Sequence, residues 1–291
     1  MLYLMMYEYG ERLDDEFIVI FCNTGKERNE TLDFVHEVET KWNVKIVWLE
    51  YDRILASKIP SDIFPTKLRN KNLKKSADAG EETHWFKIVD YESASRKGEP
   101  FDKLLNWMSS LPNVVSRGCS MQLKIRTAMR YLFSTGLKQY ESFIGIRHDE
   151  KHRAIQILGN CDKFEHPKFP LCEQEIDEAK VLEFWKINAF DLKLRSYEGN
   201  CDLCFLKAKW KRILLVRENP DMVNWWKAWE AKKSAGGEVR NGRFFRLGEP
   251  YEKIEELAHE KTLFDLVVDT TEKDIPCSCA EKAFEKGSKE L

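Results

Sequence analysis

The sequence predicts an α/β protein, with a doubly wound parallel sheet in residues 1–207 and a mostly helical extension in residues 208–291. Two apolar runs, at 17–22 and 44–49, have the continuity expected of strands that are buried on both faces. Between them, residues 27–42 repeat apolar side chains at helical spacing. A strand, a helix and a second strand in this order predict a right-handed βαβ unit, and therefore parallel strands.

The remaining elements follow from the same periodicities. A helix with an apolar stripe is expected at 1–12. The polar segment 53–83 is interpreted as a solvated connector, with a phosphate-facing loop as the alternative. Asp177 is the expected N-cap of its helix. Further strands are expected at 85–89 and 143–146, and further helices at 101–110, 123–132, 175–185, 210–217, 222–232 and 251–259.

Composition restricts the class of protein. The 291 residues carry 47 Lys plus Arg against 49 Asp plus Glu, and this net charge of -2 gives no general argument for nucleic-acid binding. No apolar run approaches the roughly 20 residues of a membrane span, and the first residues lack the basic leader of a signal peptide. Eight cysteines without an export signal favour a reducing cytoplasm and metal ligation over disulfides. We expect a cytoplasmic protein without a membrane partner.

The cysteine pattern is the most specific chemical signal in the sequence. Cys201 and Cys204 lie two residues apart in a turn-like segment, which lets both sulfurs reach one metal or cluster. Cys119 and one of Cys277 or Cys279 complete a candidate set of four ligands. Iron–sulfur clusters and structural zinc both bind thiolates, so the spacing leaves both open.

The other three cysteines receive a simpler interpretation. A cysteine outside a ligand motif usually behaves as a small buried apolar residue. We expect this of Cys22, Cys161 and Cys172.

The segment Asn23-Thr24-Gly25-Lys26-Glu27 ends one predicted strand and begins a helix. In an open parallel sheet, ligands bind beyond the carboxyl ends of the strands, and the N–H groups of a helix start favour anions. This segment is therefore a candidate ligand site. The alternative is an ordinary turn between a strand and a helix.

A second candidate site follows the predicted strand at 143–146. Arg147 and Arg153 lie on one loop, where two guanidinium groups can grip a phosphate or sulfate. Lys124 can add positive charge to the same end of the sheet. The alternative is a solvated loop.

Four motifs occur in chain order: Asn23-Thr24-Gly25-x-Glu27-x-x-Glu30-Thr31-Leu32, Arg117-x-Cys119-x-x-x-Leu123-Lys124, Gly145-Ile146-Arg147-x-Asp149-Glu150-x-x-Arg153, and Cys201-x-x-Cys204. Together they resemble the phosphoadenosine phosphosulfate (PAPS) reductase-like family of the adenine nucleotide alpha-hydrolase-like, or PP-loop, superfamily. The pattern is closest to an iron–sulfur-bearing branch that is often borne by phages or mobile elements.

This resemblance implies a five-stranded parallel sheet that binds an adenine nucleotide, either ATP or PAPS, at the carboxyl ends of its strands. It places Asn23, Thr24 and Glu27 at the nucleotide and Arg147 and Arg153 at its phosphate or sulfate end. It also implies that Cys119, Cys201 and Cys204 hold a 4Fe-4S cluster, with Cys277 or Cys279 or the substrate as fourth ligand.

The chain departs from the family pattern in two places. The family begins with a strand and a glycine-rich phosphate loop, which this chain lacks, and that strand is central in the family's sheet. Its loss would leave open strand edges and a hole in the core, so we interpret Met1 as a truncated or misassigned start, with a divergent nonbinding protein as the alternative. Cys277-Ser278-Cys279 also does not match the catalytic cysteine tail of the reductases.

Two functions follow from these observations. The first is an enzyme that uses an adenine nucleotide and an iron–sulfur cluster for sulfonucleotide reduction or ATP-dependent adenylylation. The second is a noncatalytic module, stabilised by a cluster or by zinc, that binds nucleic acid or a partner protein in DNA modification or defence. Trp225, Trp226 and Trp229 are the candidate stacking residues of the second function.

Overall fold

The computed structural model describes residues 1–59, 76–161, 163–199, 201–235 and 244–260. The protein is a mixed α/β fold with two small sheets. β1 (Val19–Asn23), β2 (Ile46–Leu55) and β3 (Glu82–Val89) form one sheet in this order, and β4 (Tyr140–Phe143) and β5 (Glu165–Lys168) form the other. β1 is parallel to β2 and β4 is parallel to β5, whereas β3 is antiparallel to β2.

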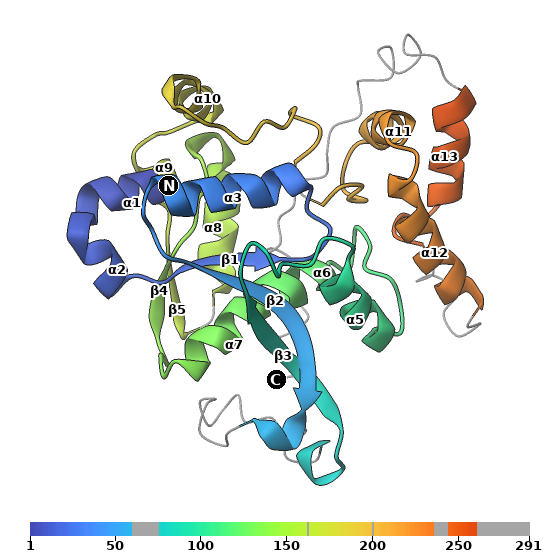
Figure 1. Ribbon diagram of the computed structural model, residues 1–291, viewed down its shortest axis with the longest axis horizontal. Helices are drawn as coiled ribbons and strands as arrows, with labels where there is room; N and C mark the ends of the chain where they lie inside the picture. The colour runs from blue at the N-terminus through green and yellow to red at the C-terminus, as the bar shows by residue number, and fades with distance from the viewer. Residues whose placement is uncertain (60–75, 162, 200, 236–243, 261–291) are drawn as a thin grey trace.

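Helices surround both sheets (Figure 1). α3 packs its apolar side, which includes Leu32 and Val38, against β1 and β2, as the periodicity predicts. Asp177 caps α10 by accepting a hydrogen bond from the Lys180 N–H at 2.9 Å, as predicted. The longer helices are α1 (Leu2–Tyr9), α3 (Asn29–Lys41), α5 (Glu99–Trp107), α7 (Arg126–Ser134), α8 (Lys151–Asn160), α10 (Glu178–Ile187), α11 (Lys209–Glu218), α12 (Met222–Ala235) and α13 (Tyr251–Glu260). The short ones are η1 (Gly10–Arg12), α2 (Leu13–Glu16), η2 (Ala56–Lys58), α6 (Gly118–Ser120), η3 (Met121–Ile125), η4 (His148–Glu150) and α9 (Pro170–Glu173).

The βαβ prediction is confirmed, because β1, α3 and β2 form a parallel pair around a crossover helix. Three expectations were wrong in detail. β2 continues to Leu55 and pairs with an antiparallel β3, so the start of the predicted connector is strand. β4 ends at Phe143, before most of the strand expected at 143–146. Arg153, expected on one loop with Arg147, lies in α8 (Lys151–Asn160).

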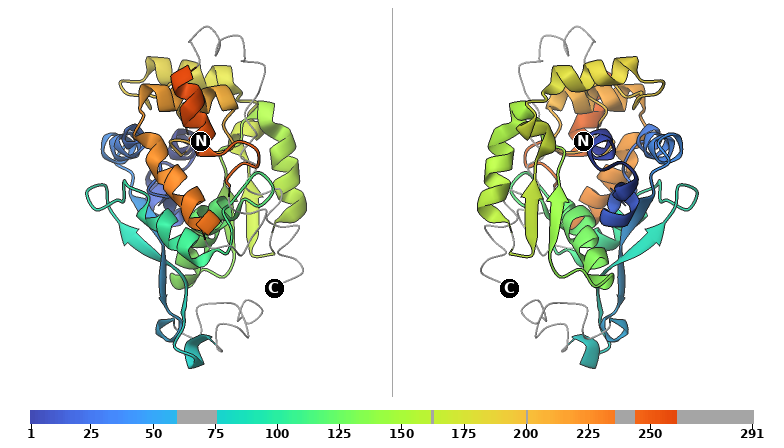
Figure 2. Two further views of the ribbon diagram at one scale, coloured as in Figure 1. Left: turned by 90° about the vertical axis from the view of Figure 1, so that its right-hand side faces the viewer. Right: turned by 90° about the vertical axis from the view of Figure 1, so that its left-hand side faces the viewer.

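The helices of the carboxyl-terminal extension share a core with the rest of the fold. The largest hydrophobic cluster joins Phe101 and Leu104 of α5 to Ile213 of α11, Trp226 of α12 and Tyr251 of α13. Figures 1 and 2 show α11, α12 and α13 gathered on one side of the molecule. The division at residue 207 stays a prediction, and a continuous core crosses it.

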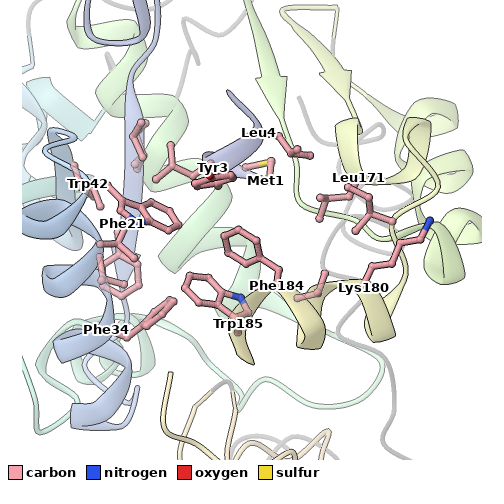
Figure 3. Close-up of a pocket in the computed structure, with 18 residues that line it drawn as sticks. Met1, Tyr3, Leu4, Phe21, Phe34, Trp42, Leu171, Lys180, Phe184 and Trp185 are labelled. Atoms are coloured by element: carbon pink, nitrogen blue, oxygen red, sulfur yellow. The ribbon is translucent and has the colours of Figure 1, made fainter. Parts of the chain in front are cut away.

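The amino-terminal helix α1 borders an apolar cavity of about 430 Å³ (Figure 3). Leu2 and Leu4 line it from α1, Phe21 from β1 and Phe184 from α10. Lys180 supplies the charged side chain that Figure 3 labels at its border. In the described part of the chain, no helix has both the length and the apolar composition needed to cross a bilayer.

Candidate functional site

The candidate site begins with the loop that follows β1. Asn23 is fully buried, and its side-chain amide donates to Glu50 Oε1 and to the Ser95 carbonyl, both at 2.8 Å. Its Oδ1 accepts the Gly25 N–H at 3.0 Å. Glu27 Oε2 accepts the N–H and the hydroxyl of Thr24 at 2.8 and 2.6 Å. The predicted nucleotide residues therefore hold one another in a rigid turn.

Gly25 is required by this turn for two reasons. Its φ of +75° lies in the left-handed region, which glycine adopts without steric cost. A Cβ at this position would lie 2.9 Å from Pro100 Cδ and 3.1 Å from the Gly98 backbone. The loop is thus pressed against the start of α5.

The Cys201–Cys204 segment packs directly on this loop. Cys201 forms an isolated backbone bridge with Glu27, and its Sγ lies 3.7 Å from the Thr24 hydroxyl. The Cys204 N–H donates to the Cys201 carbonyl at 3.3 Å, so the two cysteines lie in the tight turn that their spacing predicts. Lys124 Nζ lies 3.4 Å from Glu27 Oε1 on the same site.

Cys119, at the start of the α6–η3–α7 helical segment, lies in the same neighbourhood. Cys119, Cys201 and Cys204 all pack against one hydrophobic cluster. Burial raises the pKa of Cys201 well above its ordinary value, and the charges of Glu27, Cys204 and Cys119 raise it further, while Lys124 opposes them. Cys119 and Cys201, about 80 residues apart in sequence, thus pack against the same cluster, and no disulfide joins the described cysteines.

The arrangement falls short of a formed metal centre. Among the residues that the structure describes, no three His, Cys, Asp or Glu side chains are grouped closely enough to hold a metal ion. Cys277 and Cys279 lie outside the described residues. The donor chemistry fits a thiolate-bound cluster, since buried thiolates gain stability from a bound cation.

The three cysteines predicted to be buried apolar residues differ in their exposure. Cys22 is partly buried in β1 and donates to the Lys124 carbonyl at 3.5 Å, and burial raises its pKa to about 12. Cys172 is also partly buried. Cys161 directly follows α8 and is exposed, so its expected burial was wrong.

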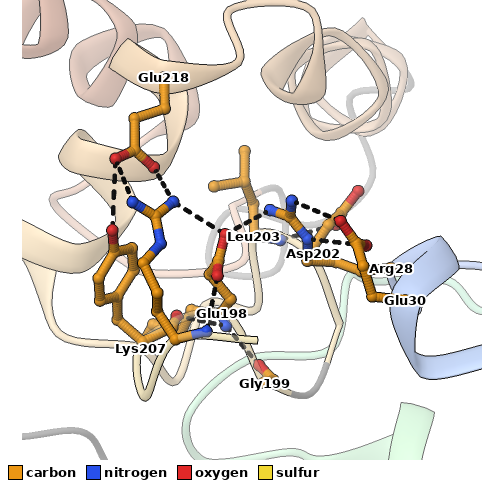
Figure 4. Close-up of polar contacts among 10 residues, drawn as sticks. Arg28, Glu30, Glu198, Gly199, Asp202, Leu203, Lys207 and Glu218 are labelled. Atoms are coloured by element: carbon orange, nitrogen blue, oxygen red, sulfur yellow. Dashed lines mark hydrogen bonds and ion pairs between the residues drawn. The ribbon is translucent and has the colours of Figure 1, made fainter. Parts of the chain in front are cut away.

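Ion pairs attach the cysteine segment to its surroundings (Figure 4). Lys26 Nζ lies 2.8 Å from Asp202 Oδ2, and both side chains are almost fully buried. Arg28 pairs with Glu198 at 3.2 Å, and Arg195 pairs with Glu198 at 2.9 Å and with Glu218 at 2.6 Å. A hydrogen bond from Arg195 lowers the pKa of Glu198 to about 2.

Helices of the extension hold the other side of the same segment. The Trp226 indole donates to Asp202 Oδ1 at 3.0 Å, and the Tyr251 hydroxyl donates to the Leu203 carbonyl. Lys207 Nζ donates to the Tyr197 carbonyl at 2.9 Å and to the Gly199 carbonyl. The cysteine turn is therefore fixed by the loop after β1 on one side and by α12 and α13 on the other.

Arg147 and Arg153 lie among acidic side chains. Arg147 pairs with Asp149 at 2.8 Å and lies within 4.0 Å of Glu150 and Glu178, and these interactions raise its pKa. Arg153 pairs with Glu150. These acidic neighbours partly neutralise the guanidinium groups, and binding of an anion there stays a prediction.

The sequence did not single out the residues that position the loop. Glu50 is 3% exposed and binds both Asn23 and the Ser95 N–H, the latter at 2.6 Å. Lys26 and Asp202 form the buried ion pair described above. Glu50 directly follows the apolar run at 44–49, and this position could have identified it, because a carboxylate next to a buried run needs polar partners.

Two of the three tryptophans proposed for nucleic-acid stacking are buried in the core, and the third, Trp225, packs against it. Trp226 and Trp229 are 1% and 6% exposed. The indole N–H groups of Trp225 and Trp229 both donate to Asp102 Oδ1, at 2.8 and 2.7 Å. The buried rings of Trp226 and Trp229 are not exposed for stacking on bases, and binding of nucleic acid or a partner protein stays a prediction.

Comparison with known proteins gives one informative similarity. The chain is 25% identical over 221 residues to the uncharacterized nin region protein ORF290 of Escherichia phage lambda. The match covers 74% of this chain and 65% of the phage protein's length. No protein-family model and no solved structure matches the chain.

Proposed function

We propose that the protein is a PAPS reductase-like enzyme, which performs adenine-nucleotide-dependent sulfur or nucleotide chemistry beside an iron–sulfur cluster. One observation carries the proposal: the Cys201–Cys204 turn packs on the loop at the carboxyl end of β1, with the Thr24 hydroxyl 3.7 Å from the Cys201 sulfur, and Cys119 packs against the same hydrophobic cluster. The carboxyl end of a parallel strand is where α/β proteins bind nucleotides. The similarity to a phage protein supports the expected phage setting.

In this proposal Cys119, Cys201 and Cys204 hold a 4Fe-4S cluster, with Cys277 or Cys279 as the fourth ligand. The cluster would supply electrons or activate sulfur when bound. Zinc is the alternative occupant, because it binds the same thiolates. The proposal includes a doubly wound α/β fold, to which both sheets would belong.

The nucleotide would lie over the loop of Asn23, Thr24, Gly25 and Glu27. Since the side chains of this loop bind one another, its contribution is a fixed surface of backbone groups. Lys124, whose side chain is 42% exposed, would neutralise phosphate charge at the mouth of the site, and Arg147 and Arg153 would bind the distal phosphate or sulfate. Sulfonucleotide reduction and ATP-dependent adenylylation share these binding needs.

Calorimetry with ATP and with PAPS on anaerobically purified protein tests this function. Lys124→Met should weaken binding of the nucleotide by about 10- to 100-fold, because a charged hydrogen bond contributes about 1.5–3 kcal/mol. Lys168→Met is the matched control, since Lys168 is 47% exposed and pairs with Glu141 at 3.6 Å, as Lys124 is 42% exposed and pairs with Glu27 at 3.4 Å. Equal losses in both variants, or no binding of either nucleotide, would contradict the proposal.

A further inference from the structure

Two arginines of α7 carry buried positive charge. Arg130 is 7% exposed, and its Nη2 donates to Gln122 Oε1 at 3.1 Å, but its Nη1 is buried and has no hydrogen-bond partner among the described residues. Arg126, four residues earlier and so on the same face of the helix, is half-buried. Burial lowers the pKa of Arg126 and that of Arg130, the latter to about 9, so both stay cations at pH 7.

Two polar side chains of the sheet beside this pair are uncharged. The phenol oxygen of Tyr51 on β2 lies 2.6 Å from Nδ1 of His84 on β3, in a hydrogen bond. Burial raises the pKa of Tyr51 to about 12. Burial also lowers the pKa of His84 to about 3, and the charges of Arg130, Arg53 and Arg126 act in the same direction. Neither group therefore supplies a negative charge at pH 7.

The acidic side chains whose charges reach Tyr51 already have partners. Glu82 Oε2 lies 3.7 Å from Arg53 Nε, and Asp52 pairs with Lys103. In the described part of the chain, no acidic side chain raises the pKa of either arginine of α7. A buried charge without a counter-charge is costly, so the pair favours the binding of an anion.

Space for a small ligand lies next to the same sheet residues. Arg53 and His84 line a cavity of about 560 Å³ together with Trp107 at the end of α5. Glu81, which also lines this cavity, accepts the Ser76 hydroxyl at 2.8 Å. Figure 1 shows α5 and α7 beside the ribbon of β2 and β3. The arginine pair is therefore close to a part of the molecule that a ligand can reach.

The arginine pair is separate from the site proposed for the nucleotide. Lys124 of η3 pairs with Glu27 in the loop after β1, whereas the charges of Arg126 and Arg130 act on His84 of β3. Positions 124 and 126 lie on different sides of a helix. η3 is a π-helical turn that leads directly into α7, and such turns are frequent at functional sites.

We propose that Arg126 and Arg130 bind an oxyanion of the phosphate class, which is either inorganic phosphate or the phosphate group of a monoester. A guanidinium group forms two parallel hydrogen bonds to a phosphate, and two guanidinium groups match the charge of a dianion. Arg130 forms the buried end of the site through its Nη1, and Arg126 forms the end nearer to solvent. The inference does not depend on nucleotide or cluster binding.

Calorimetry with inorganic phosphate and with ribose 5-phosphate, on the full chain at pH 7 and constant ionic strength, tests the proposal. Arg126→Gln should weaken binding by about 10- to 100-fold, because it removes a charged hydrogen-bond donor. Arg96→Gln is the matched control and should leave binding unchanged. Arg96 is also half-buried, and it donates to the Ala94 and Tyr91 carbonyls at 2.9 and 3.0 Å.

Urea unfolding gives a second readout. Phosphate should raise the midpoint of the wild-type protein and of Lys124→Met but not that of Arg130→Met, because an anion that binds only the folded state stabilises it. Binding of inorganic phosphate alone would support a site for the free ion, and tighter binding of ribose 5-phosphate would support a site for a monoester.

Three results would overturn the proposal. The first is the absence of binding of both compounds. The second is equal weakening of binding in Arg126→Gln and Arg96→Gln. The third is an effect of phosphate that is lost in Lys124→Met and kept in Arg126→Gln, since this would assign the anion to the loop after β1.

Discussion

The sharpest prediction concerns Gly25, which sets the turn between β1 and the cysteine segment. The substitution Gly25→Ala should destabilise the folded protein in two ways. An L-residue at φ +75° costs about 1–2 kcal/mol, and overpacking against Pro100 Cδ at 2.9 Å and the Gly98 backbone at 3.1 Å costs about 1–3 kcal/mol. The free energy of unfolding should therefore fall by about 2–5 kcal/mol.

Gly80→Ala is the matched control, because Gly80 has φ +67° but no atom within 4 Å of the added Cβ. Its cost should be limited to the backbone term of about 1–2 kcal/mol. Urea unfolding, followed by circular dichroism, measures both variants, and a lower midpoint at constant m-value reports the loss. Equal costs for the two substitutions would refute the close packing of the loop against α5.

Three further predictions follow from the burial and charge of single groups. The pKa of Glu198 is lowered to about 2 by Arg195, so its carboxylate stabilises the fold above its ordinary pKa of 4.5 and loses this effect as the pH falls toward 2. Glu198→Gln should flatten the dependence of unfolding free energy on pH in that window, and an unchanged slope would contradict the pairing. Burial raises the pKa of Glu230 to about 7, so stability should fall as the pH rises from 4.5 to 7, and Glu230→Gln should remove that slope, which the same pH series checks. Iodoacetamide followed by mass spectrometry should label exposed Cys161 in the folded protein well before Cys22, and equal labelling rates would contradict their different burial.

The sequence was informative where a local pattern determines the structure. Apolar periodicity located β1, α3 and β2, and the Cys201–Cys204 spacing located a tight turn. The antiparallel pairing of β3 was not predictable, because strand direction depends on a connection whose length and composition do not specify it. The gathering of Cys119 beside Cys201 also depends on tertiary packing, which spacing alone does not encode.

The site shows a similar division between pattern and packing. The position of Asn23 and Thr24 at the carboxyl end of an apolar strand was predictable from the sequence, and nucleotide binding by them stays a prediction. The hydrogen bonds by which Asn23 holds the loop could not be predicted, because their partners Glu50 and Ser95 lie in other segments. Likewise, the ion pair of Lys26 with Asp202 joins residues that are distant in the chain and carry no motif.

The central claim is that Cys119, Cys201 and Cys204 converge on one inorganic centre beside the loop after β1. Anomalous X-ray scattering from crystals of anaerobically purified protein, recorded at the iron and zinc absorption edges, tests it directly. We predict a cluster of iron peaks in which each of the three sulfurs has an iron within bonding distance, about 2.3 Å. A peak that excludes Cys119, or the absence of any metal peak at these sulfurs, would contradict the claim.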